Sequence, residues 1–278
     1  MAEVRGDTRV RRFTHGLVDL LGHCVALQNG QKWRDIRSLF EPIISHAATT
    51  KLMPAFHDDI HDLLRSLQCS TSPESQSFGA EVSGYFPKLQ LRFVARAFYG
   101  EILTEEALGQ LIKLFQVRSM LGSKAFLSAH LVYRIYAYLP TATNKQLNEY
   151  IREFEEFNLR AVELAKAKNL HCPLVPVFDA VKNDNKVTLQ ECLQTIDEIL
   201  FENIDVGASG LSFLLLNMAS SREAQHDLRS EAMATSNANG PVVLGTDASA
   251  YVAKGNTFLD LCCRESRRLC PALRKCLF

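Results

Sequence analysis

The sequence has no excess of charge of either sign. Its 278 residues contain 31 Lys and Arg and 31 Asp and Glu, which gives a formal net charge of 0 at pH 7. A protein that binds nucleic acid through its phosphates needs an excess of basic side chains. We therefore expect no nucleic-acid partner. The apolar content of 47% is also too high for a disordered chain.

Residues that interrupt helices are sparse, with only 14 Gly and 9 Pro. Residues of high helix propensity, such as Leu, Ala, Glu and Lys, are common, and stretches with strand-like composition, such as Pro241–Leu244, are short. A repeat with a period of about 20–50 residues is absent, which gives no support for a solenoid. The composition predicts a mostly α fold.

Several well-defined catalytic motifs are absent. The sequence contains no G-x-S-x-G, which argues against a serine hydrolase of that type, and neither G-x-G-x-x-G nor G-x-x-x-x-G-K-[ST], which argues against the common nucleotide sites. No Cys-x-x-Cys pair supports a zinc knuckle or a thioredoxin-type site. We expect reduced thiols, several of them buried. The cysteines are at positions 24, 69, 172, 192, 262, 263, 270 and 276.

A long apolar segment is missing from the sequence as well. Met1–Arg12 is polar and carries four arginines, without the apolar run of a signal peptide behind it. The longest strongly apolar stretch, Leu211–Ala219, is shorter than the ~20 residues that span a bilayer. We therefore expect no membrane anchor in these residues, and the localisation of the protein stays open.

Helical periodicity together with turn signals predicts a series of helices. Pro42 is expected to end the first of them. The connections are predicted at 69–76, 171–176 and 234–255. The predicted helices cover residues 31–40, 51–67, 89–98, 104–115, 146–168, 188–218, 220–233 and 256–269.

The longest predicted helix begins at Thr188, where T-L-Q-E matches a capping box. Apolar residues then cover a broad arc, which is typical of a helix in the centre of a domain. Glu202, Asn203 and Asp205 interrupt this apolar surface. Buried carboxylates and amides are costly unless they are hydrogen-bonded or functional, so this is the first place where the sequence indicates chemistry.

A pair of histidines offers a second candidate site. H-D-D-I-H places His57 and His61 on one helix face, at the spacing that zinc-binding helices use. Asp58 stands where the metalloprotease pattern has Glu, and no third ligand suggests itself. We therefore favour a solvated helix face of mixed charge over a metal site.

Three segments, in this order along the chain, resemble motifs of one enzyme family. The first is Gly30–Pro42, in which Trp33, the single tryptophan, and Arg37 are four residues apart and share a helix face. It is similar to the W-x-x-x-R helix of the cytochrome P450 family of haem-thiolate monooxygenases. The resemblance implies that Trp33 and Arg37 bind a haem propionate. Taken alone, the two residues would be interpreted as a packing tryptophan and a surface arginine.

The second segment is Ile199–Ser212, which resembles the family's central oxygen-binding helix with its A/G-G-x-D/E-T-T core. The resemblance implies that Asp205 is a catalytic relay acid, whereas the residues alone also allow a buried polar group bonded to a neighbouring turn. Val206 stands where the family has threonine, so the relay is expected to be impaired. Ser209, one turn later, is a candidate substitute hydroxyl.

The third segment is Phe258–Pro271, which is similar to the E-x-x-R helix of the family. Glu265 and Arg268 are three residues apart, near enough for a two-pronged pair between guanidinium and carboxylate. The resemblance implies a structural role for both residues. E-x-x-R by itself is a weak motif, but the three segments in this order are specific together.

The family's haem-binding loop, F-x-x-G-x-R-x-C-x-G, does not occur in the 278 residues. Cys270 and Cys276 lie on or just after the third segment without that context, so we predict no axial metal ligand. A thiolate ligand is what favours O–O cleavage. Haem is the cofactor that the resemblance implies, but its binding by this chain is in doubt. We expect a truncated gene, a mispredicted gene model or a degenerate copy.

The resemblance implies a single incomplete domain over residues 1–278, a partial P450 fold that lacks most of the β-sheet and the cysteine loop. It implies insertion of one oxygen atom of O₂ into a small organic substrate, with a reductase as electron donor, and activity that is impaired or lost here. Around Asn203–Asp205 and Phe258–Pro271 the sequence resembles enzymes of fungal secondary metabolism most. Members of the family are often bound to the endoplasmic reticulum. The alternative is a non-catalytic helical fragment or partner-binding module.

Overall fold

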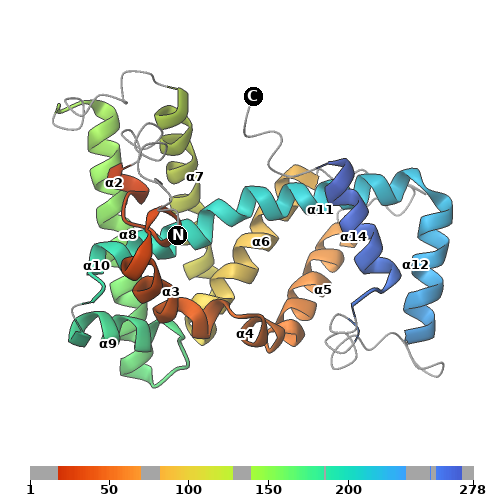
Figure 1. The fold of residues 1–278 in the computed structure, drawn as a ribbon, viewed down its shortest axis with the longest axis horizontal. Helices are drawn as coiled ribbons and strands as arrows, with labels where there is room; N and C mark the ends of the chain where they lie inside the picture. Colours follow the sequence, from red (N-terminus) through yellow and green to blue (C-terminus); the bar gives the residue numbers. More distant parts are fainter. Residues whose placement is uncertain are drawn as a thin grey trace, which may run out of the picture. The chain divides into compact units, whose positions relative to one another are not determined.

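The structure, a computed structural model, describes residues 18–69, 82–127, 139–184, 186–235, 251 and 255–270. Every regular element in these residues is helical and none is a strand (Figure 1), which confirms the predicted mostly α fold. Most of the residues in the connections predicted at 69–76 and 234–255 lie outside the described part, as do residues 241–244 and Cys276. The principal helices are α3 (Gly30–Ile44), α5 (Met53–Cys69), α6 (Val82–Tyr99), α7 (Glu105–Leu127), α8 (Ala142–Lys168), α9 (Leu174–Asp184), α10 (Leu189–Asp197), α11 (Asn203–Ser220), α12 (Arg222–Thr235) and α14 (Phe258–Leu269).

Short elements connect these helices. Two of them are the helix α2 (Val18–Leu21) and the 3₁₀ turn η1 (Val25–Leu27), which precede α3, and α4 (His46–Thr50) comes after it. A second 3₁₀ turn, η2 (Gly100–Ile102), comes after α6. Between α10 and α11 the chain forms a π-helical turn, η5 (Glu198–Glu202), so Leu189–Ser220 is one uninterrupted helical run.

The chain divides into two compact units. The first comprises Met1–Ile44 and Val94–Glu202, and the second comprises Ser45–Phe93 and Asn203–Phe278. In the first unit α8 packs against α7, α9 and α10, and α10 also packs against α9, α2 and η1. In the second unit α11, α12 and α14 pack against one another.

The core of the first unit is apolar with a few polar bonds inside it. Phe40 of α3 and Phe98 of α6 lie with their ring centroids 6.2 Å apart. The Tyr99 hydroxyl donates a hydrogen bond to Oδ1 of the fully buried Asn158 at 2.9 Å, and Asn158 Nδ2 donates to the Phe154 carbonyl at 2.8 Å. These bonds satisfy buried polar atoms and fix α6 against α8.

The predicted capping box at the start of α10 is confirmed. The Thr188 hydroxyl accepts a hydrogen bond from the Glu191 backbone N–H, and the Glu191 carboxylate accepts one from the Thr188 N–H. The same carboxylate lies 2.7 Å from the ammonium of Lys32 on α3. A local sequence signal therefore also provides a contact between two helices of the first unit.

Several predicted helix boundaries are wrong. Helix α6 begins at Val82 rather than at residue 89, and α7 continues to Leu127 rather than ending at residue 115. Helix α3 continues through Pro42 to Ile44, although Pro42 cannot donate the helical hydrogen bond to the carbonyl four residues earlier. Ile43, the next residue, is buried and holds the turn in place. The predicted break at 171–176 is shorter than expected, since α9 begins at Leu174, which is completely buried.

The second unit is held by side chains that bond across its helices. Asn217 on α11 donates through Nδ2 to the Ser266 hydroxyl on α14 at 2.9 Å. The Glu231 carboxylate on α12 accepts hydrogen bonds from the Phe258 and Leu259 N–H groups at 2.8 and 3.2 Å. Because these are N–H groups of the first turn of α14, Glu231 caps that helix from another helix.

The helical run Leu189–Ser220 is long and apolar enough to cross a membrane by length and composition. It is the one run of this kind in the part of the chain that the structure describes. This helical run is longer than the apolar stretch Leu211–Ala219 found in the sequence, because η5 joins α10 and α11 into one run. Its first half packs into the first unit, with Cys192, Ile196 and Leu200 completely buried, and a buried core helix meets the same two criteria.

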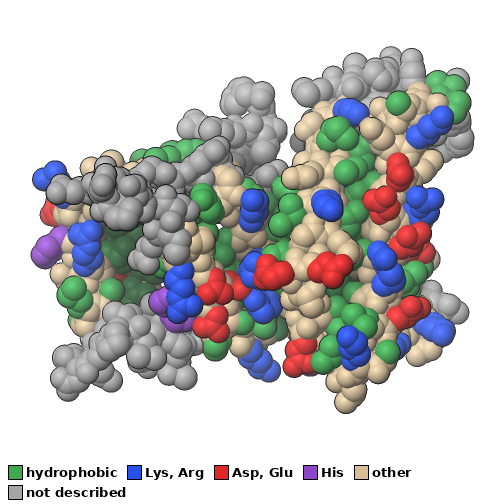
Figure 2. Space-filling view, turned by 180° about the vertical axis from the view of Figure 1, so that it is seen from behind, with side chains coloured by type: hydrophobic (Ala, Val, Ile, Leu, Met, Phe, Trp, Pro, Cys, Tyr) green, Lys and Arg blue, Asp and Glu red, His purple; other side chains and the backbone are tan. Residues whose placement is uncertain are grey.

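On the face drawn in Figure 2, acidic and basic side chains are interspersed, as the even charge balance suggests.

We expect Gly100→Ala to destabilise the protein. Gly100 has a φ of +54°, and an added Cβ would lie 2.4 Å from the His171 carbonyl oxygen. That oxygen accepts the Glu101 N–H at 3.0 Å, so it cannot move away freely. The strain and the clash together should lower the free energy of unfolding by about 1–3 kcal/mol.

Urea unfolding of the purified protein checks this expectation. Gly109→Ala is the matched control, because Gly109 lies inside α7 with no atom within 4 Å of an added Cβ. It should stabilise the protein by about 0.5–1 kcal/mol through helix propensity. Equal effects of the two substitutions would show that the conformation of Gly100 does not matter.

Candidate functional site

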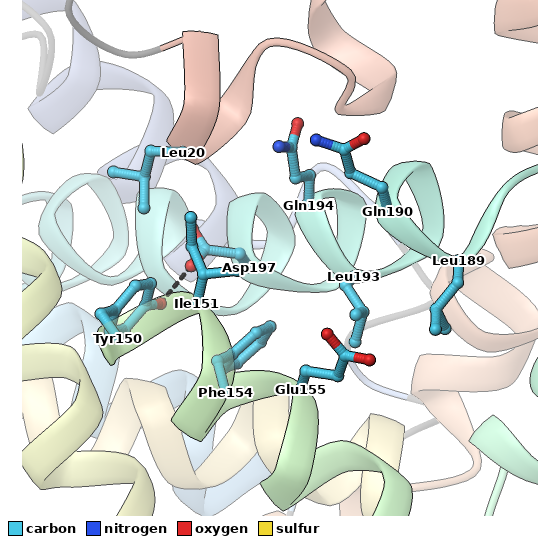
Figure 3. A pocket seen from close by; sticks show the side chains of 10 residues that line it. All are labelled: Leu20, Tyr150, Ile151, Phe154, Glu155, Leu189, Gln190, Leu193, Gln194 and Asp197. Carbon is cyan, nitrogen blue, oxygen red and sulfur yellow. Dashed lines mark hydrogen bonds between the residues drawn. The ribbon is translucent and has the colours of Figure 1, made fainter. Parts of the chain in front are cut away.

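The first unit contains a cavity of about 320 Å³ between α8, α10 and α2 (Figure 3). Most of its wall is apolar, with two amides and two carboxylates among the lining groups. Among the lining residues, the Tyr150 hydroxyl donates a hydrogen bond to Asp197, which is drawn as a dashed line in Figure 3. The lining residues are Leu20, Tyr150, Ile151, Phe154, Glu155, Leu189, Gln190, Leu193, Gln194 and Asp197.

Asp197 carries a buried carboxylate with donors from two other helices. Its side chain is 2% exposed. Oδ1 accepts a hydrogen bond from Nε of Arg118 on α7 at 3.2 Å, and Oδ2 accepts one from the Tyr150 hydroxyl on α8. Charge-assisted hydrogen bonds of this kind offset the cost of taking a carboxylate out of water. The group therefore joins α7, α8 and α10.

Burial and pairing act in opposite directions on this cluster. Burial raises the pKa of Asp197 to about 6, and the neighbouring Arg118 lowers it. Burial opposes the charge on Arg118, but the carboxylates of Asp197 and Glu202 outweigh it and raise the pKa of Arg118 above its usual value. Burial also raises the pKa of Tyr150. At neutral pH the cluster is an ion pair with a neutral phenol donating to it.

Arg118 has a second acidic partner. Its NH2 group donates to Oε1 of Glu202, the last residue of the π-helical turn η5. The Glu202 side chain is 48% exposed, so this half of the contact lies at the surface of the first unit. Arg118 is therefore held by two carboxylates, that of Asp197 just before η5 and that of Glu202 at its end.

A further set of polar side chains on the same run of helix holds the chain before α3. Amide N–H groups in this segment would otherwise lack partners, because most of them are not part of a regular helix. The acceptors succeed one another along one side of α10 and η5. The hydrogen bonds run from His23 N to Gln194 Oε1 at 2.6 Å, from Val25 N to Thr195 Oγ1 at 3.2 Å, and from Ala26 N to Glu198 Oε2 at 3.3 Å.

Trp33 and Arg37 lie together on the outer side of α3 in the first unit. Trp33 is 44% exposed, although large aromatic side chains are usually buried. Arg37 donates through Nε to Glu41 Oε2 at 2.7 Å, and its side chain is 43% exposed. Ile36 and Phe40 form the buried stripe of the helix. The indole is therefore partly exposed to solvent, and the role that the resemblance gives it stays a prediction.

Asp205 lies in the first turn of α11, in the second unit, and its side chain is outside the described part of the structure. Val206 next to it is 37% exposed. Gly207 is in close contact with α6, because a Cβ added there would meet the Gln90 side chain at 2.7 Å. Ser209 is half-buried on the same helix.

Glu265 and Arg268 form the two-pronged pair that their spacing predicts. Arg268 donates through Nε to Oε2 at 2.7 Å and through NH2 to Oε1 at 2.6 Å. The arginine bond lowers the pKa of Glu265. Both side chains are exposed on α14 in the second unit, and the role that the resemblance gives them stays a prediction.

The His57 and His61 rings on α5 lie 4.4 Å apart in an edge-on arrangement. Among the described residues, no group of three or more His, Cys, Asp or Glu side chains could hold a metal ion. Cys270 is half-buried at the end of α14, and Cys276 is outside the described part. Burial raises the pKa of Cys192 to about 12, so this thiol stays protonated at neutral pH.

Comparison with known proteins identifies the protein family to which the chain belongs. The sequence model of the family "Cytochrome P450" matches residues 2–274, and the chain belongs to this family. "Cytochrome P450 monooxygenase lepD" of Aspergillus flavus is 31% identical over 91% of this chain and 49% of its own length. "Cytochrome P450 monooxygenase PUL2" of Kluyveromyces lactis is 27% identical over 92% and 50%, and "Cytochrome P450 monooxygenase apdB" of Emericella nidulans is 27% identical over 96% and 54%.

The fold comparison agrees with the sequence comparison. The chain superimposes on the crystal structure of a cytochrome P450, CYP102L1, with a TM-score of 0.65 and 14% identity, over 92% of this chain and 58% of that one. At this identity the likeness shows the fold alone. It confirms the predicted partial P450 fold. The chain spans about half the length of the curated relatives it matches.

The cluster of Arg118, Tyr150 and Asp197 was not predicted from the sequence. One signal for it was present, because Asp197 lies one helical turn from Leu193 and Leu200, which belong to the apolar arc of the longest predicted helix. A buried acid predicts a basic partner. Nothing in the sequence identifies Arg118 as that partner, since it lies 79 positions away.

The raised pKa of Asp197 gives stability a definite pH dependence. The folded-state pKa of about 6 lies above the ordinary value of 3.8, so the folded protein binds this proton more tightly than the unfolded chain. The contribution of the group to stability is complete below about pH 4 and is lost as the pH rises through about 6. We expect the stability advantage of the wild type over Asp197→Asn to fall by about 1 kcal/mol between about pH 5 and about pH 7.5.

Urea unfolding of both proteins at the two pH values measures this difference. Asp62→Asn, at an exposed position on α5, controls for the loss of one acidic charge. An advantage that grows with rising pH would mean that pairing with Arg118 dominates over burial.

Proposed function

We propose that this protein is a haem-dependent monooxygenase that inserts one oxygen atom of O₂ into a small organic molecule of fungal secondary metabolism. The observation that carries the proposal is the family match over residues 2–274, together with relatives that are fungal cytochrome P450 monooxygenases. A reductase would supply the electrons. When bound, the haem supplies the site at which O₂ is reduced and cleaved.

The residues at the start of α3 fit a haem propionate. An anionic group at this face would find an indole N–H and a guanidinium one helical turn apart, and the indole is 44% exposed without a role in the core. Arg37 uses Nε for Glu41, which leaves its terminal nitrogens for a second carboxylate. We assign Trp33 and Arg37 to this role on these grounds.

In the second unit Asp205 would supply protons from its carboxyl group. A relay needs a second group that can accept and pass on the proton. Val206 has only methyl groups where the family has a hydroxyl, so the transfer has to proceed through water or through Ser209. We therefore propose that proton delivery in this protein is slower than in relatives that keep the threonine.

The thiolate ligand is the part of the site that residues 1–278 do not provide, because F-x-x-G-x-R-x-C-x-G is absent from them. The buried cysteines are unsuited to replace it. Cys24, Cys172 and Cys192 are buried, and burial raises their pKa values. We propose that these residues supply the helical part of a haem site, and that residues 1–278 alone are impaired or inactive as a monooxygenase.

The spectrum of the reduced carbon monoxide complex tests the proposal. We expect residues 1–278, expressed with a haem precursor, to lack the red-shifted Soret band of thiolate-ligated haem. The same residues joined to a cysteine loop from a relative should show the band. Cys270→Ser and Cys276→Ser in residues 1–278 are the matched controls for an unexpected ligand.

Two results would overturn parts of the proposed function. A red-shifted band from residues 1–278 that disappears in Cys270→Ser or Cys276→Ser would overturn the proposed lack of a ligand. Absence of the band and of any bound haem even with the loop attached would overturn the monooxygenase and favour a non-catalytic helical module.

Trp33→Phe and Arg37→Ala test the propionate assignment through haem retention. Each loses a donor to a charged group, so haem in the loop-joined protein should dissociate about tenfold faster or more. Transfer of haem to excess apomyoglobin measures the rate without any need for turnover. Arg152→Ala is the control, because Arg152 is also an exposed arginine with a glutamate four residues later. Equal rates in all three variants would contradict the assignment.

A further inference from the structure

The π-helical turn η5 separates the residues that pack in the first unit from Asp205, and one arginine contacts both ends of it. Arg118 donates through Nε to Asp197, just before the turn, and through NH2 to Glu202, its last residue. The arginine is itself held in place by burial, since its side chain is 9% exposed. The two bonds therefore fix one end of the turn relative to the other.

A regular α-helix could not make both bonds in this way. Residues advance by about 100° around an α-helix, so residues five apart point about 140° away from each other. In a π-helix the hydrogen bonds run from i to i+5, and residues five apart come back to nearly the same side. Asp197 and Glu202 are five apart, and they reach one guanidinium because the turn between them is wide.

The start of the turn has partners of its own. Gln194 and Thr195 on α10, and Glu198, the first residue of η5, accept hydrogen bonds from the backbone of the segment before α3. The far end of the turn, at Glu202, is bonded to Arg118. Opening or closing the turn would therefore have to break the bond between Glu202 and Arg118.

We propose that Arg118 is a positioning residue, which holds η5 in its wide form through Asp197 and Glu202. This role of Arg118 needs no cofactor. Asp197 holds the arginine in the core, and Glu202 is the partner through which the arginine holds the far end of the turn.

Glu202 is also the position at which the proposal can be tested without disturbing the core. Its side chain is about half exposed, and Arg118 keeps its bond to Asp197 when Glu202 is removed. Glu202→Ala releases the far end of the turn. Glu202→Gln keeps an oxygen acceptor but loses the charge, so its effect should be smaller.

Hydrogen–deuterium exchange resolved by peptide is the measurement. In Glu202→Ala, amides of residues 198–206 should exchange about tenfold faster, because a charge-assisted hydrogen bond no longer opposes opening of the turn. Residues 189–196 and 212–220 should be unchanged, and Glu202→Gln should be intermediate. Glu156→Ala on α8 is the control, since Glu156 is an exposed partner of Arg152 and should leave η5 unaffected.

Two results would overturn the proposal. Unchanged exchange in residues 198–206 would show that Glu202 does not hold the turn. Faster exchange throughout α3, α10 and α14 would show that the contact supports the fold in general and positions nothing in particular.

The carbon monoxide spectrum of the loop-joined protein separates this proposal from the proposed function. A red-shifted band with unchanged exchange overturns the role of Arg118 alone. A missing band with faster exchange at η5 overturns the monooxygenase and still supports the arginine as the residue that holds the turn.

Discussion

A carboxylate that is 2% exposed needs hydrogen-bond donors on both oxygens, and Asp197 obtains them from two different helices. Removing one partner of such a buried pair costs about 3–5 kcal/mol, because the remaining charge stays unpaired. Helices α7, α8 and α10 are therefore tied to one arrangement. The aromatic contacts of Phe201 with Phe115 and Phe154, at centroid distances of 5.8 and 5.9 Å, form around this fixed point. Apolar packing alone would tolerate small shifts that a buried ion pair does not.

The central helical run has polar side chains on more than one side, and each side has its own partner. Gln194, Thr195 and Glu198 accept from backbone amides, whereas Asp197 and Glu202 accept from Arg118. The sequence indicates chemistry at Glu202, Asn203 and Asp205. The polar residues before Asn203, Glu202 among them, bond to other parts of the first unit, and these hydrogen bonds explain why the helix tolerates them.

Structural features that depend on residues a few positions apart could be predicted from the sequence, whereas features that depend on distant residues could not. The capping box at Thr188 and the pair of Glu265 with Arg268 need only three residues of spacing, and both form. The end of α3 was misplaced because the burial of Ile43 decides it and the sequence shows only Pro42. Arg118 was missed because a partner 79 positions away leaves no mark in a local pattern. The family was found through three motifs, whereas the exposure of Trp33 required the structure.

The bonds between the segment before α3 and α10 also have a consequence for biosynthesis. Residues 23–26 find their acceptors at 194–198, a separation of 170 to 172 positions. At about 5–20 residues per second, a ribosome needs roughly ten to thirty seconds to make the intervening chain. During that interval the amides of residues 23–26 can bond only to water or to other partners, because their final acceptors have not yet been made. The early helices of this protein therefore lack part of their final contacts until α10 has been made.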